Sequence, residues 1–134
     1  MDAEYYTPDV EDIHIGFECE INYPKGWIPI KVEDLYTDSD GYGNAYEVEH
    51  TIKNSPQDIR VSYLKSAQIE KEGWVLYDPI NVVYRKGNFC LIHKSDKHEI
   101  EIADTDSSYG MQVKYDGSCK SINEFRVIIK LLKI

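Results

Sequence analysis

Regular alternation of apolar and polar residues is the feature that most restricts how this sequence can fold. From Asp12 to Asn22 every odd-numbered position is apolar or cysteine, and every even-numbered position is polar, charged or glycine. Successive side chains of a strand point to opposite faces, so this period of two predicts a half-buried strand. Its outer face would carry His14, Glu18 and Glu20.

Similar patterns predict further strands. Trp27–Val32 is expected at a sheet edge, because Pro29 has no N–H to donate to a neighbouring strand. A tight turn at residues 86–88 would join two strands in a hairpin. The other segments predicted as strands are 45–52, 59–64, 82–85, 89–93, 98–103 and 111–115.

Two helices are predicted. Residues 66–72 form a short helix that ends at Gly73, a residue suited to the left-handed conformation found there. Ser121 and Glu124 have the spacing of a capping box at the start of a C-terminal helix. We therefore predict an α+β fold, with a twisted antiparallel sheet of about six or seven strands, a short central helix, and a C-terminal helix packed on one face.

The length and composition favour one domain. The chain has 134 residues, within the usual range of a single domain, and residues 1–11 are expected to be a polar lead-in. It contains no run of 18 apolar residues and begins with a polar, acidic segment, which argues against a membrane span or a signal peptide. Its three cysteines lack metal-site spacing and are typical of free thiols in the cytoplasm.

Charge is distributed very unevenly. Residues 1–50 hold 13 acids and two bases, a net −11, whereas residues 51–134 hold 11 acids and 13 bases, a net +2. The acidic half would repel nucleic acid and anionic membranes and attract a basic protein surface. The alternative is an acidic surface that serves only to keep the protein soluble.

The acidic half also contains the residues that we expect to bind a partner. Glu18 with Glu20, and Glu47 with Glu49, lie two positions apart on predicted strands, and neighbouring strands would merge them into one acidic plate. Two further acids lie in the polar loop at 37–44. The predicted partner-binding residues are Glu18, Glu20, Asp38, Asp40, Glu47 and Glu49.

The segment from Asp38 to Glu49 has several ligand positions of a calcium-binding EF-hand loop. Tyr42, however, occupies a position that needs an oxygen ligand, and the flanking segments read as strands rather than helices. We therefore expect an acidic surface loop, with calcium binding as the alternative. No other metal site and no cofactor is predicted.

No catalytic motif is present in the sequence. Cys90 and His93 are three positions apart on one predicted strand and would point to opposite faces, so they could not act together. The four histidines (His14, His50, His93 and His98) form no cluster with metal-ligand spacing. We expect a protein that is not an enzyme, although a cleft that brings a histidine and a carboxylate together remains an alternative.

Several segments carry a resemblance to known sequences. They are DIHIGFECE at 12–20, IRVSYL at 59–64, IEKEGW at 69–74 and SINEFRVI at 121–128. Together they resemble small proteins of Bacteroidetes genomes and of their phages and prophages. The resemblance implies a phage-related context and assigns no chemistry to any residue.

Two functions follow as hypotheses. The first is a non-enzymatic phage inhibitor of a host defence nuclease, such as a CRISPR effector, that imitates nucleic acid with its acidic surface. The alternative is a small-ligand protein that sequesters a nucleotide signal with bases of the second half. Those bases are Arg60, Lys65, Arg85, Lys86, Lys114 and Arg126.

Overall fold

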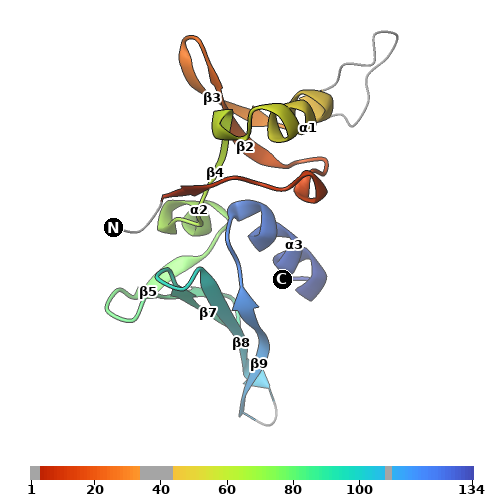
Figure 1. Ribbon diagram of the computed structural model, residues 1–134. Coiled ribbons are helices and arrows are strands. Elements are labelled where there is room, and N and C mark those ends of the chain that lie inside the picture. The colour runs from red at the N-terminus through yellow and green to blue at the C-terminus, as the bar shows by residue number, and fades with distance from the viewer. Residues whose placement is uncertain (1–3, 34–43, 108–109) are drawn as a thin grey trace. The chain divides into compact units, whose positions relative to one another are not determined.

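The computed structural model describes residues 4–33, 44–107 and 110–134 (Figure 1). The chain divides into two compact units, Met1–Ser62 and Tyr63–Ile134, here called the N-terminal and C-terminal units. The predicted α+β class, with antiparallel strands and a C-terminal helix, is confirmed. Within the described residues the strands form two sheets, of four and five strands, where one sheet was expected.

The sheet of the N-terminal unit joins strands that are distant in the sequence. Its order is β1 (Tyr5–Tyr6), β4 (Ile59–Ser62), β2 (Glu18–Tyr23) and β3 (Gly26–Lys31), and every neighbouring pair is antiparallel. β3 lies at an edge, as Pro29 predicted. Within the segment expected to be a polar lead-in, Tyr5 and Tyr6 form β1, which pairs with β4.

The predicted strand from Asp12 is shorter than expected. β2 begins only at Glu18, after a 3-10 turn, η1 (Val10–Asp12), and Gly16, whose φ of +94° is incompatible with an extended strand. Ile15 is consequently 62% exposed although its position in the alternating pattern predicted burial. From Phe17 onward the alternation holds, since Phe17, Cys19 and Ile21 are all buried.

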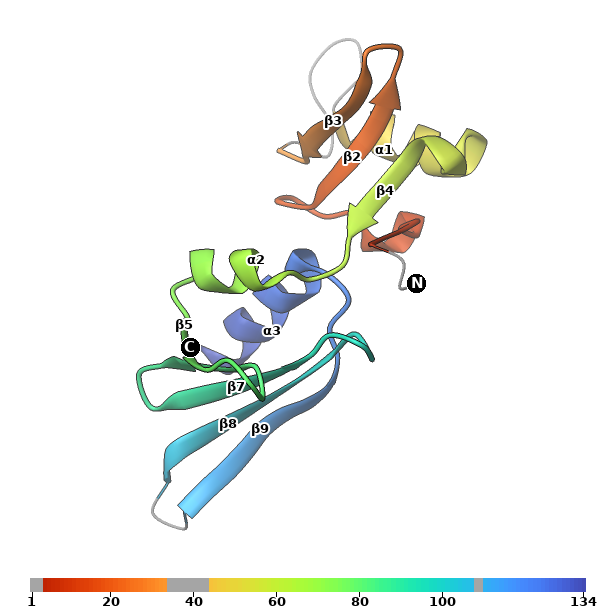
Figure 2. The same ribbon diagram turned by 90° about the vertical axis from the view of Figure 1, so that its left-hand side faces the viewer.

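The prediction of a strand at 45–52 is wrong, because this segment lies in helix α1 (Asn44–Asn54). Ala45 and Val48, three positions apart, are both buried, and Ile52 packs against the same core. This spacing places them on one side of a helix. α1 covers the face of the sheet that carries Cys19 and Ile21 (Figures 1 and 2).

The sheet of the C-terminal unit is an antiparallel meander in which each strand pairs with the next along the chain. Its order is β5 (Val75–Asp78), β6 (Val83–Lys86), β7 (Phe89–Lys94), β8 (Glu99–Ser107) and β9 (Gly110–Ser118). The predicted β6–β7 hairpin is confirmed. The strands predicted at 98–103 and 111–115 are longer than expected, since β8 continues to Ser107 and β9 runs from Gly110 to Ser118.

Both predicted helices of this unit are confirmed. α2 (Ser66–Lys71) ends before Gly73, which has a φ of +97°. α3 (Ile122–Leu132) begins with the Ser121 hydroxyl accepting a hydrogen bond from the Glu124 N–H. The Glu124 carboxylate does not complete the predicted capping box, since it accepts from the Lys120 N–H at 2.8 Å.

The core of the C-terminal unit lies between its helices and one face of its sheet (Figure 2). Phe125 of α3 is fully buried and meets Trp74 edge to face, with 6.4 Å between ring centroids. Leu91 and Ile102 contribute the sheet side of this core. Within the part of the chain that the structure describes, no helix has the length and apolarity needed to cross a membrane.

Candidate functional site

The uneven charge of the sequence coincides with the division into units. The N-terminal unit holds 14 acids and four bases, a net −10, whereas the C-terminal unit holds 10 acids and 11 bases, a net +1. The candidate site for a basic partner is therefore the surface of the N-terminal unit. Of the acids predicted to bind a partner, two lie on β2, two lie on α1 and two lie outside the described residues.

The two glutamates of β2 lie opposite basic residues. Glu18 is in register with Lys31 of β3, and Glu20 is in register with Arg60 of β4. The Glu20 carboxylate accepts a hydrogen bond from the Arg60 Nε at 2.7 Å. β2 therefore presents cross-strand pairs of opposite charge, and its glutamates do not form a uniform acidic row.

Arg60 also binds two aromatic rings. Its guanidinium carbon lies 3.9 Å from the centroid of the Tyr5 ring and 4.0 Å from that of the Trp27 ring. Tyr5, Arg60, Glu20 and Trp27 come from β1, β4, β2 and β3 respectively, so this one side chain connects all four strands. Arg60 thus already has three partners within the sheet, and a small ligand would have to compete with them.

Glu47 and Glu49 lie on α1 and not on a strand. The expected acidic plate, which required their strand to lie beside β2, is therefore wrong. Glu49 forms an ion pair with Lys53, one helical turn later, at 2.7 Å. Glu47 lies close enough to Cys19 to contribute to the raised pKa of that thiol.

The remaining predicted acids, Asp38 and Asp40, lie outside the described residues, as does the first half of the segment considered for calcium binding. In the part that the structure does describe, no three histidine, cysteine, aspartate or glutamate side chains are grouped to hold a metal ion. Glu49, the last ligand position of the EF-hand alternative, lies in α1.

A further acidic group lies in and next to η1, here called the acidic turn: Asp9, Glu11 and Asp12. All three side chains are exposed. The Asp12 carboxylate accepts a hydrogen bond from the Asp9 N–H at 2.9 Å, which shapes the turn. Within the described ranges no base forms an ion pair with these carboxylates. The sequence signal for this group is three acids within four residues directly after Pro8.

Two buried thiols and one buried histidine have pKa values that are shifted mainly by burial. Burial raises the pKa of the Cys19 and Cys119 thiols to about 12, and nearby carboxylates add to this effect, so both stay protonated near neutral pH. His93 is buried, which lowers its pKa, with His98 as a second cause. Cys90 lies on the opposite face of β7 from His93, as the alternation predicted.

The bases expected to bind a small ligand lie on several elements. Lys86 and Arg126 both line a pocket of the C-terminal unit. Arg85 lies over the Tyr77 ring, 4.9 Å from its centroid. Lys65 precedes α2, and Lys114 lies on β9. Only Lys86 and Arg126 of this predicted set are therefore brought together among the residues described.

Comparisons with models of protein families, with curated proteins and with solved structures found no match for this chain.

Proposed function

We propose that the N-terminal unit binds a basic surface of another protein, and that the protein is a non-enzymatic inhibitor of a partner that handles nucleic acid. The observation that carries this proposal is the net charge of −10 on the N-terminal unit beside +1 on the C-terminal unit. A concentrated negative field accelerates encounter with a basic groove and disfavours acidic partners.

The ion pairs within the unit indicate which acids contribute most to binding. Glu20 and Glu49 already have cationic partners, and a basic partner would have to compete with Arg60 and Lys53 for them. The acidic turn needs no such exchange, because its three carboxylates are exposed and have no ion pair among the described residues. We place the centre of the proposed interface at the acidic turn, with the predicted glutamates contributing to the surrounding field.

The class of partner follows from the chemistry of the surface and from the resemblance to phage and prophage proteins. A groove that holds a nucleic acid backbone is lined by lysine and arginine, which a carboxylate surface can bind in its place. A host defence nuclease has such a groove and fits the phage-related context. Occupation of the groove would block access of the nucleic acid without any chemical step by this protein.

A capture experiment at two salt concentrations tests the proposal. The immobilised protein is exposed to a bacterial lysate at about 50 mM and about 500 mM salt, since screening at high ionic strength weakens exposed charge contacts. We expect a basic, nucleic-acid-binding protein at low salt and its loss at high salt. Displacement of that protein by added DNA or RNA would show that both bind the same groove. Capture of no such protein at low salt would contradict the proposal.

Two matched variants then locate the interface. The first neutralises the acidic turn with Asp9→Asn, Glu11→Gln and Asp12→Asn, which keeps side-chain size and the local hydrogen-bond acceptors. The second makes the same charge change at exposed acids of the C-terminal unit, with Glu70→Gln, Asp96→Asn and Asp106→Asn. We expect the first to weaken binding of the captured partner by about tenfold at low salt and the second to have little effect. Equal weakening would show that only total charge matters.

A further inference from the structure

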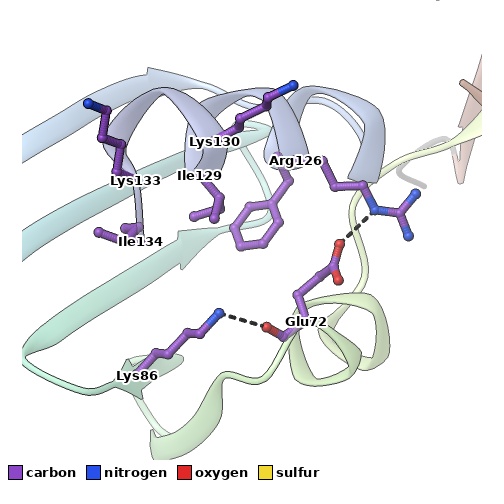
Figure 3. Close-up of a pocket in the computed structure, with 8 residues that line it drawn as sticks. Glu72, Lys86, Arg126, Ile129, Lys130, Lys133 and Ile134 are labelled. Atoms are coloured by element: carbon purple, nitrogen blue, oxygen red, sulfur yellow. Dashed lines mark hydrogen bonds and ion pairs between the residues drawn. The ribbon is translucent and has the colours of Figure 1, made fainter. Parts of the chain in front are cut away.

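The C-terminal unit has a pocket beside α3 (Figure 3). Its volume is about 370 Å³, which lies at the small end of the range for small-molecule sites. We call it the α3 pocket. It is lined by Glu72, Lys86, Phe125, Arg126, Ile129, Lys130, Lys133 and Ile134.

The pocket has an apolar floor. Phe125 is fully buried beneath it, and Ile129 and Ile134 are half-buried. In Figure 3 the side chains of Ile129 and Ile134 lie on the side of α3 that faces Lys86. Half-buried aliphatic side chains at an opening still have apolar surface that a ligand can remove from water. The floor therefore favours a ligand with an organic body over a bare inorganic ion.

The rim of the pocket is positively charged. Among the side chains that line the pocket, four are basic and that of Glu72 is the one carboxylate. Glu72 is already bound on both sides, because its carboxylate accepts from the Arg126 Nε at 2.6 Å and its carbonyl accepts from the Lys86 Nζ at 3.1 Å. This arrangement connects α2, α3 and β6, and it leaves an excess of positive charge at the opening.

Two lysines supply that excess. No side-chain hydrogen bond or ion pair connects Lys130 or Lys133 to any part of the chain that the structure describes. Both are exposed, and Figure 3 shows their ammonium groups at the outer rim, extended away from Lys86. A lysine has a flexible four-carbon stem, so its ammonium group can turn toward a bound anion while the backbone stays in place.

The spacing of the cations indicates the charge of the ligand. Arg126, Lys130 and Lys133 follow one side of α3 and its C-cap, over a length of about 10 Å at the rise of an α-helix. A single carboxylate could reach only part of this row. A chain of phosphates could contact all of it while an attached apolar group covers Ile129 and Ile134.

We propose that the α3 pocket binds a small organic polyphosphate, with its phosphates along the row of cations on α3 and its organic body on the apolar floor. This site lies in the C-terminal unit and does not depend on the function proposed for the acidic N-terminal unit. A nucleotide is the simplest probe of this class.

Three probes separate the parts of the proposal. Binding to the full chain is measured by calorimetry at low salt, without divalent cations, using ATP, inorganic tripolyphosphate and adenosine. We expect ATP to bind, tripolyphosphate to bind more weakly and adenosine to give no signal at millimolar concentration. Equal binding of ATP and tripolyphosphate would overturn the role of the floor. Equal binding of ATP and adenosine would overturn the role of the cations, and no binding of ATP would overturn the site.

A double variant tests the residues. Lys130→Gln with Lys133→Gln removes two charges and keeps the side-chain stems. Lys97→Gln with Lys114→Gln makes the same change at exposed lysines outside the pocket. We expect about a tenfold loss of ATP affinity in the first and little change in the second, since each exposed charge contact is worth a few-fold at low salt. NMR shifts of Ile129 and Ile134 methyl groups on adding ATP to the unmodified protein provide an independent check; unchanged shifts would contradict the assignment.

Discussion

The two units are built from the same kinds of element but connect them differently. In the C-terminal unit each strand pairs with the next along the chain, whereas the N-terminal sheet has the order β1-β4-β2-β3. β4 reaches its place in that sheet only after the chain has passed through α1. Sequential pairings depend on short turns that a sequence displays, and distant pairings depend on which surfaces fit together. This difference explains why more elements of the C-terminal unit than of the N-terminal unit follow from local sequence patterns.

The units also use charge differently. The C-terminal unit balances its charge, with 10 acids and 11 bases, and pairs such as Arg126–Glu72 connect its elements. The N-terminal unit has 14 acids for four bases, and it uses Arg60 to connect four strands. Its acids therefore outnumber its bases by ten, which suits a surface that binds a basic partner.

The largest expected effect tests whether the two units unfold independently. Phe125→Ala removes a fully buried ring from the core of the C-terminal unit and should lower its free energy of unfolding by about 3–5 kcal/mol. Amide hydrogen exchange should show the loss in β7, β8 and α3. Val127→Ala, at a 45% exposed position of the same helix, is the control and should change little. An equal loss of protection in β2 and α1 would show that the units unfold as one.

A smaller effect is expected at the centre of the N-terminal sheet. Arg60→Ala removes two cation–π contacts and the ion pair with Glu20, and should cost about 1–2 kcal/mol in a denaturant titration. Lys53→Ala is a suitable control, since it breaks an exposed ion pair on α1 worth about 0.3–0.5 kcal/mol. Equal effects of the two variants would mean that the stacked geometry of Arg60 adds no stability.

The start of α3 provides a test within the C-terminal unit. Ser121→Ala removes the hydroxyl that accepts from the Glu124 N–H and should destabilise the unit by about 1 kcal/mol. Ser118→Ala, an exposed serine at the end of β9, controls for the loss of a hydroxyl. If thermal unfolding of the two variants is indistinguishable, the cap contributes nothing to the helix.

The smallest effect is expected from pH. Burial, with His98 as a second cause, lowers the pKa of His93 below its ordinary value of 6.5 in the folded chain. The unfolded chain then binds a proton at a higher pH than the folded one, so the stabilising contribution is complete above about pH 6.5 and is lost as the pH falls toward the lowered pKa. Denaturant titrations of the full chain at several pH values should show that the free energy of unfolding falls as the pH is lowered below about 6.5.

His93→Gln should reduce the dependence of the free energy of unfolding on pH, whether or not the substitution itself changes stability. His50→Gln, at an exposed position of α1, should leave that pH dependence unchanged. A slope that persists in His93→Gln would assign the pH dependence to other groups.

Local patterns in the sequence were enough to place many elements. The edge position of β3, the β6–β7 hairpin, the end of α2 at Gly73 and the start of α3 at Ser121 each depend on one or a few neighbouring residues. Proline, glycine and serine act there through their own backbone chemistry, which is the same in any fold. The uneven charge of the chain is likewise a property of the sequence alone.

Packing in the tertiary structure decided features that the alternation of apolar and polar residues could not determine. The pattern of apolar and polar residues at 45–52 fits both a strand and a helix, and burial of Ala45 and Val48 in the core of the N-terminal unit selected the helix. The same packing removed the acidic plate expected from Glu47 and Glu49. Pairing of Glu20 with Arg60, 40 residues later, and convergence of Lys86, Arg126 and Ile134 on one pocket also arose in three dimensions. Periodicity defines which face of an element is apolar, but only packing between distant segments defines which residues meet there.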